Sequence, residues 1–181
     1  LDLLGVSPKD VDGVERYLDE LTVEIEYDED GKQHMIMNGM DVTDDIRTPD
    51  ISKKASDVSA HGCVREMLLD MQRDVAKQYN VVMDGRDIGT VVLPKADVKI
   101  FLTASAEVRA KRRTLELEAK GQKADYNQIL KAIQERDYND SHRAIAPLKM
   151  ARDSIKVDTS DMNIDEVILT IRQIVGKKIP V

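Results

Sequence analysis

The segment from Asp84 to Gly89, Asp-Gly-Arg-Asp-Ile-Gly, combines residue types that suit phosphate binding. Glycines let the backbone approach a ligand closely, and a guanidinium such as that of Arg86 can donate two parallel hydrogen bonds to a phosphate. The two aspartates, Asp84 and Asp87, can orient that arginine, a base or a metal. A helix-capping turn with a surface ion pair fits the hexapeptide equally well, because Asp-Gly turns are common. Taken alone, the segment leaves both interpretations open.

A second group of charged side chains lies near the carboxyl end of the chain: Arg136, Asp140, Arg143, Lys149 and Arg152. The formal net charge of the whole chain is -7, so this local excess of cations indicates an anionic ligand. Several arginines around one phosphoryl group would neutralise the charge that develops on its oxygens during transfer. A solvated helix face, with Arg136 and Asp140 paired four residues apart, explains the same pattern and is favoured on this cluster alone. The nearby run of Arg109, Arg112 and Arg113 is also expected to face solvent.

Other functional classes find little support in the sequence. The three histidines have no metal-ligand spacing and Cys63 has no partner cysteine, so we assign no metal-ligating residues. Five Tyr and one Phe are too few for a single-strand nucleic-acid platform, and no apolar run approaches the roughly 20 residues of a membrane helix. A metal-dependent phosphatase using Asp84 and Asp87 lacks the Asp-x-Asp spacing. We therefore expect a cytoplasmic protein without nucleic-acid or membrane partners.

The elements that must position these residues alternate between short strands and helices. Apolar strands are expected at residues 80–83, 98–102 and 154–157, with helices at 105–120, 126–138 and near the carboxyl terminus. The last helix is expected to present Val167, Ile168, Ile171 and Ile174 to the core. This alternation predicts an α/β domain with a parallel sheet and flanking helices. Ligands of such sheets bind beyond the carboxyl ends of the strands, where the segment from Asp84 to Gly89 lies.

The first third of the chain follows a different pattern. Residues 21–27 and 33–38 alternate apolar and polar side chains around an Asp-Glu-Asp-Gly-Lys turn, which predicts an antiparallel hairpin. Thr48-Pro49-Asp50 opens a helix, and a second helix is expected from about residue 62 to residue 79. We expect an antiparallel insertion over residues 1–60 and a core α/β domain over residues 61–181.

Together, these segments resemble bacterial cytidylate kinases, which are nucleoside monophosphate kinases. The resemblance covers essentially the whole chain and rests on ordered blocks: Ile46-Arg47-Thr48, Ala55-Ser56, Val64-Arg65-Glu66, residues 84–94, residues 99–105, Arg109-x-x-Arg112-Arg113, Glu135-Arg136-Asp137 and residues 139–148. The resemblance implies a P-loop kinase fold that transfers the γ-phosphoryl group of ATP to CMP or dCMP with Mg²⁺, in a monomeric protein. It also implies that residues 1–60 bind the monophosphate and that residues 120–145 form a helical lid.

The resemblance further implies the roles of individual residues. Ser56, Arg65 and Asp87 match positions that face the cytosine edge, and polar pairing of this kind discriminates bases strongly. Asp84, Arg136 and Asp140 would lie near the sugar and phosphate, while Arg86 and Arg143 would hold phosphates and Arg47 would contact the monophosphate. The catalytic residues would be Arg86, Arg136 and Arg143, and Arg112 would pack on the adenine of ATP. Between Arg136 and Arg143, where relatives often carry further arginines, this chain has Asn139, Ser141 and His142.

The 181 residues contain no Gly-x-x-x-x-Gly-Lys-Ser/Thr segment. In this family that loop and its Lys hold the transferring phosphates. We therefore expect the phosphate loop and the first strands of the fold to lie outside these 181 residues. Two hypotheses follow: a kinase of which this chain is one part, or a CMP-binding module without kinase activity.

Overall fold

The computed structural model describes residue 1 and residues 4–179, apart from the side chains of residues 49, 52, 53 and 56. The chain forms two compact units, Leu1–Tyr79 and Asn80–Val181. The boundary expected from the sequence lay at residue 60, whereas the first unit extends to Tyr79. Helix α3 (Gly62–Gln78) belongs to the first unit because it packs against helix α1 (Val11–Leu18), and the His61 ring bonds the Pro8 carbonyl at 2.7 Å.

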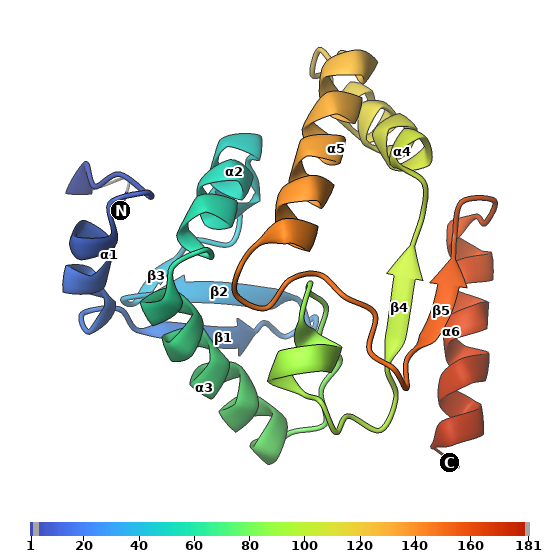
Figure 1. Ribbon diagram of the computed structural model, residues 1–181, viewed down its shortest axis with the longest axis horizontal. Helices are drawn as coiled ribbons and strands as arrows, with labels where there is room; N and C mark the ends of the chain where they lie inside the picture. Colours follow the sequence, from blue (N-terminus) through green and yellow to red (C-terminus); the bar gives the residue numbers. More distant parts are fainter. Residues whose placement is uncertain (2–3, 180–181) are drawn as a thin grey trace. The chain divides into compact units, whose positions relative to one another are not determined.

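The first unit contains the expected antiparallel sheet (Figure 1). Strands β1 (Val23–Tyr27), β2 (Gln33–Met37) and β3 (Met40–Asp41) pair in that order, with Val23 opposite Met37. Asn38 and Gly39 connect β2 and β3 with φ angles of 49° and 77°, as two-residue hairpin turns require. The hairpin predicted from alternating residues is therefore confirmed.

Two shorter helical elements follow the sheet. They are the 3₁₀ turn η2 (Asp45–Arg47) and helix α2 (Pro49–Val58). The Thr48 hydroxyl accepts a hydrogen bond from the Ile51 amide at 3.3 Å, which caps the helix where Thr-Pro-Asp predicted a start. The unit's buried apolar side chains include Val14 of α1 and Val64 of α3.

His34 connects the ends of the sheet through two carboxylates. Its Nδ1 lies 2.7 Å from Asp41 Oδ2 and its Nε2 lies 3.2 Å from Asp28 Oδ2. Hydrogen bonds that the His34 ring donates to the carboxylates of Asp41 and Asp28 raise the pKa of His34. The pKa of Asp41 is lowered by hydrogen bonds from the Thr43 hydroxyl, the Thr43 amide and His34. That of Asp28 is lowered by the Lys32 amide and by His34.

We therefore expect the first unit to lose stability as the pH rises from about 6 to 8, through and above the ordinary histidine pKa. A raised folded-state pKa gives stabilisation that is complete below the unfolded-state value and disappears above the folded-state value. Thermal unfolding of the parent and of His34→Gln at pH 5.5 and pH 8 measures this. The melting temperature of His34→Gln should depend less on pH than that of the parent. The melting temperature of the control, His142→Gln, should depend on pH as strongly as that of the parent. An equal pH dependence in all three proteins would contradict the prediction.

The second unit is built on two parallel strands, β4 (Ile100–Thr103) and β5 (Ile155–Asp158). Ile100 pairs with Ile155 and Thr103 with Asp158, so both carboxyl ends lie at the same edge. Helix α4 (Ala106–Ala119) leaves that edge, α5 (Tyr126–His142) runs back along α4 and packs against it, and α6 (Ile164–Lys178) follows β5 (Figure 1). The predicted α/β arrangement, with a small parallel sheet, helices and an antiparallel sheet, is confirmed.

One expected strand does not form. Residues 80–83 have no regular secondary structure, and the Val82 side chain is fully exposed. An apolar run becomes a strand only when a neighbouring strand satisfies its backbone hydrogen bonds. Among the described residues, no strand pairs with this segment, so the prediction was wrong for this structure.

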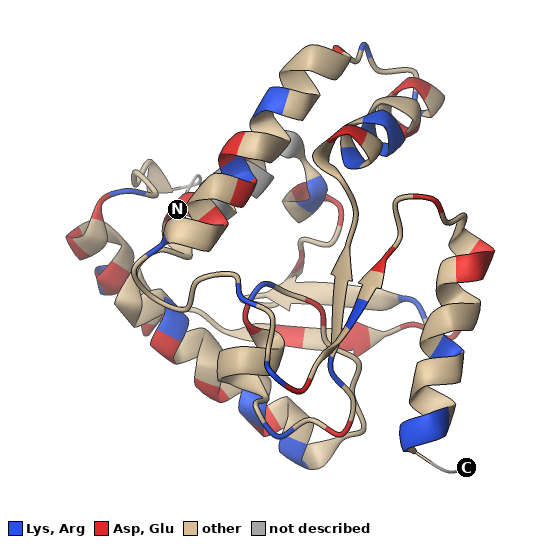
Figure 2. Ribbon diagram, turned by 45° about the vertical axis from the view of Figure 1, so that its right-hand side comes forward, with Lys and Arg blue, Asp and Glu red and all other residues tan. Residues whose placement is uncertain are grey.

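Helix α6 is stabilised at both ends by its charges. Asn163 and Glu166 form a reciprocal capping box, with distances of 3.0 and 2.8 Å. Acidic residues occupy its first turn and Lys177 and Lys178 its last, which complements the helix dipole (Figure 2). None of the helices in the described part of the chain combines the length and apolar character needed to cross a bilayer.

Candidate phosphate-binding site

The segment from Asp84 to Gly89 is a compact turn in the second unit. The Asp87 carbonyl accepts hydrogen bonds from the amides of Thr90, Val91 and Val92 and so begins the π-helical turn η3 (Ile88–Val92). Such turns are frequent at functional sites. A Cβ at Gly85 would lie 2.8 Å from Ile88 Cγ1, so a larger residue there would force the Ile88 side chain to move. The buried Val92 anchors the turn.

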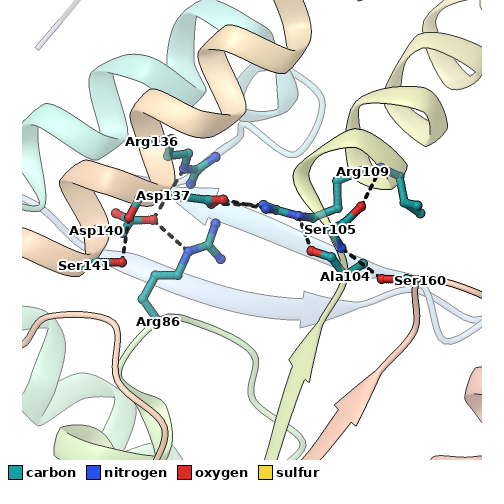
Figure 3. A network of polar contacts seen from close by, with 10 residues as sticks. Arg86, Ala104, Ser105, Arg109, Arg136, Asp137, Asp140, Ser141 and Ser160 are labelled. Atoms are coloured by element: carbon teal, nitrogen blue, oxygen red, sulfur yellow. Dashed lines mark hydrogen bonds and ion pairs between the residues drawn. The ribbon is translucent and has the colours of Figure 1, made fainter.

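Asp140 is the buried centre of the site. It lies on the last turn of α5 and is only 7% exposed. Its Oδ2 accepts a hydrogen bond from Arg86 Nε at 2.9 Å and lies 3.8 Å from Arg136 Nε. Figure 3 shows both arginines directed at this one carboxylate. Burial of Asp140 rules out a purely solvent-facing interpretation of the pair it forms with Arg136.

A second arginine–aspartate pair lies next to this centre in the sequence. Arg143 is the first residue after α5, and its Nη2 lies 3.5 Å from Asp87 Oδ1, with the two side chains 15% and 12% exposed. Arg143 Nε also donates to the Ala146 carbonyl at 2.7 Å. Ala146 has a φ of 46°, an uncommon conformation for a residue with a side chain. The Leu148 amide donates to the Asp140 carbonyl at 2.7 Å, which folds this segment back on α5.

The charges of this cluster favour an anionic ligand. Three guanidinium groups, those of Arg86, Arg136 and Arg143, face two carboxylates, those of Asp87 and Asp140. One positive charge therefore remains in excess, and the carboxylates orient the donors before a ligand arrives. Oriented guanidinium donors bind phosphate oxygens in a bidentate way and neutralise charge during transfer.

The sequence also predicts Asp84, Arg47, Arg65 and Ser56 at the site. Asp84 is exposed in the segment that precedes Arg86. Arg47 and Arg65 belong to the first unit, where Arg47 ends η2 and Arg65 Nη1 donates to the Ser59 carbonyl at 3.3 Å. The side chain of Ser56 lies outside the described residues.

Arg112 contacts the segment after β5. Its guanidinium donates to the Thr159 and Met162 carbonyls and to the Thr159 hydroxyl. The loop that follows β5 is thereby held against α4, at the carboxyl edge of the parallel sheet.

The sequence analysis missed one ion pair near the site. Arg109 of α4, expected to face solvent, forms two hydrogen bonds with Asp137 of α5. A signal was available, because Ser105, Arg109 and Arg112 recur at positions i, i+4 and i+7 and so share one helix face. The partner on α5 is 28 residues away, which that spacing does not reveal.

The described residues offer no set of metal ligands. Within residue 1 and residues 4–179, no three His, Cys, Asp or Glu side chains gather closely enough to hold a metal.

Arginines that are oriented by carboxylates, as in this α/β unit, suit bidentate recognition of phosphate. A family model for cytidylate kinase matches residues 4–177. Curated cytidylate kinases from Lactobacillus johnsonii, Lactobacillus gasseri and Caldicellulosiruptor bescii are 52%, 50% and 47% identical over 83%, 89% and 96% of this chain. The chain belongs to the cytidylate kinase family. It spans 65%, 70% and 76% of the lengths of those three relatives.

Proposed function

We propose that the protein transfers the γ-phosphoryl group of ATP to CMP or dCMP. The observation that supports this most strongly is the cluster of Arg86, Arg136 and Arg143 held by Asp87 and Asp140, in a chain of this family. Phosphoryl transfer relies on positioning and charge neutralisation. Fixed arginines supply both without reorganising during the reaction.

The acceptor nucleotide is assigned to residues that match the acceptor positions of this family. Ser56, Arg65 and Asp87 face the cytosine edge, Arg47 contacts the monophosphate, and Asp84, Arg136 and Asp140 lie near the sugar and phosphate. Residues 1–60 form the monophosphate-binding part and residues 120–145 the lid. Closure of this lid would bring the arginines of α5 to the phosphates and exclude water.

ATP is assigned to the neighbourhood of Arg112. The edges of the Arg112 guanidinium donate to the Thr159 and Met162 carbonyls, which orients its planar face. A guanidinium face stacks on aromatic rings, so adenine fits there. Mg²⁺ would enter with ATP, because Mg²⁺ is held largely by the phosphates and water in such enzymes.

Coupled measurement of ADP release by the protein at its full natural length tests the proposal. CMP and dCMP should be phosphorylated with kcat/KM values at least about 100-fold above that for AMP, since a site that pairs polar base groups rejects mismatched bases. Similar values for all nucleoside monophosphates would overturn the cytosine assignment. Tight CMP binding by calorimetry without any ADP release would replace the kinase by a CMP-binding module.

A further inference from the structure

One face of α4 connects three parts of the second unit. Its amino-terminal cap, Ser105, accepts the Val108 amide at 3.2 Å, and the Ser105 amide donates to the Ser160 hydroxyl at 3.0 Å. Two turns further along, Arg112 donates to the carbonyls of Thr159 and Met162. These contacts fix α4 to the loop that leaves β5.

Arg109 lies between these two contacts on the same face. Its Nε donates to the Ala104 carbonyl, directly after β4, at 3.0 Å. Its Nη1 lies 3.0 Å from Asp137 Oδ1 and its Nη2 lies 2.5 Å from Asp137 Oδ2. Two parallel bonds fix the direction as well as the distance of the pair, and the Asp137 carboxylate raises the pKa of Arg109. Arg109 therefore joins the carboxyl end of β4 to α5 (Figure 3).

The position of Asp137 on α5 links this pair to the candidate site. Asp137 directly follows Arg136 and precedes Asp140 by three residues, which is slightly less than one helical turn. A rotation or shift of α5 that moves Asp137 moves both of these neighbours as well. Misplacing reacting or binding groups by about 1 Å can reduce a rate by roughly 100-fold.

Stability alone is a weak explanation of the Arg109–Asp137 pair. The two side chains are 37% and 38% exposed, and ion pairs this exposed contribute little to folding stability. The neighbouring pair of Arg113 and Glu116 has similar exposure, 37% and 45%, but lies within α4 and does not reach α5. The two pairs thus differ in what they connect, not in how deeply they are buried.

We propose that Arg109 and Asp137 are positioning residues, which set the orientation of α5 and so align Arg136 and Asp140 with the phosphates. This inference rests on the proposed function. Neither residue is required to touch a nucleotide. Their role is to hold the helix that carries the groups in contact with it.

A double-mutant cycle in the protein at its full natural length tests the inference. Asp137→Asn, Arg109→Ala and the double variant are compared with Glu116→Gln, which removes the similarly exposed carboxylate that pairs with Arg113 and Lys120 within α4. We expect Asp137→Asn and Arg109→Ala each to lower kcat/KM for CMP by roughly 10- to 100-fold. The double variant should be no more than about twofold worse than the poorer single variant, because both act through one contact. The melting temperatures of Asp137→Asn and Glu116→Gln should agree within about 2 °C.

The outcomes separate the two proposals. Activity of Asp137→Asn equal to that of Glu116→Gln, fully additive losses, or a large fall in melting temperature that accounts for the lost activity would each overturn the positioning role. A parent protein that phosphorylates a different monophosphate overturns the cytosine assignment, and the cycle measured with that acceptor then decides the positioning role. A parent inactive with every monophosphate overturns both.

Discussion

Replacing Arg143 with alanine is expected to lower kcat/KM for CMP by about 100- to 1000-fold, the loss seen when a single fixed donor to transition-state charge is removed. Arg143 is mostly buried and is held by Asp87 and by the Ala146 carbonyl. Its guanidinium is therefore oriented before the phosphates arrive. Alanine removes both the charge and its orientation, while the backbone contact from the Arg143 amide to the Asn139 carbonyl remains.

The effect on folding should be much smaller. Loss of hydrogen bonds to a charged group costs about 1–3 kcal/mol, so the second unit should remain folded at ambient temperature. Steady-state kinetics and thermal unfolding, measured on the same samples, separate the two effects. The kcat/KM of Arg143→Lys should fall between the values of the parent and of the alanine variant, since lysine keeps the charge and loses the planar guanidinium. The exposed Arg172 of α6 belongs to neither arginine cluster and supplies the control, and Arg172→Ala should behave like the parent. Normal turnover with a strongly lowered melting temperature in Arg143→Ala would contradict the role.

Local elements were predictable because their signals are local. The charged run predicted a helix over residues 105–120, and α4 is Ala106–Ala119, with Ser105 as its cap. The helix expected at residues 126–138 continues to His142 as α5, because polar residues 139–142 gave no apolar period to follow. Strands expected at 98–102 and 154–157 form as β4 and β5 within two residues.

Elements that depend on partners were not predictable in the same way. Residues 80–83 carry the composition of a strand, yet a strand needs a neighbour, and the pattern cannot supply one. The apolar residues of α6 led to a similar overestimate, here of how many side chains are buried. Ile168 was expected in the core together with Val167, Ile171 and Ile174, but it is 48% exposed, while the other three are half-buried.

The candidate site shows the same difference between local signals and contacts that depend on the fold. The sequence places Asp87 and Arg143 on separate segments 56 residues apart, and only the fold brings their side chains to 3.5 Å. Arg136 and Asp140 were recognisable as an i, i+4 pair, but the burial of Asp140 and its bond to Arg86 were not. Residue types and order were sufficient to suggest phosphate chemistry. The pairing that orients each arginine follows from how α4, α5 and the 84–92 turn pack.

Replacing Asp140 with asparagine is expected to reduce both stability and activity, unlike the change at Arg143. Asparagine has nearly the same shape but removes the charge that Arg86 and Arg136 share. Both Nε atoms lie within 3.8 Å of the same carboxylate oxygen. Two guanidinium groups close to the same oxygen, once its charge is removed, repel by about 2–4 kcal/mol at an effective dielectric constant of about 20.

Solvent reduces that repulsion, because the side chains of Arg86 and Arg136 are 41% and 49% exposed. We expect Asp140→Asn to lower the free energy of unfolding by about 1–3 kcal/mol. A more positive cluster attracts anions more strongly, which would improve CMP binding if charge alone mattered. Orientation should dominate, since an unheld guanidinium loses the fixed fork that phosphate recognition requires. CMP affinity and kcat should therefore both fall, together by about 100-fold in kcat/KM.

Denaturant unfolding, calorimetry with CMP and steady-state kinetics on Asp140→Asn measure these effects. Glu135→Gln provides the matched control, because it removes the same charge from the same helix at a side chain that is 66% exposed. This control should stay within about 0.5 kcal/mol of the parent and keep its activity. Tighter CMP binding by Asp140→Asn would show that net charge, rather than orientation of Arg86 and Arg136, governs the site. The Asp140 carboxylate would then weaken phosphate binding, and would not be the group that orients the arginines for it.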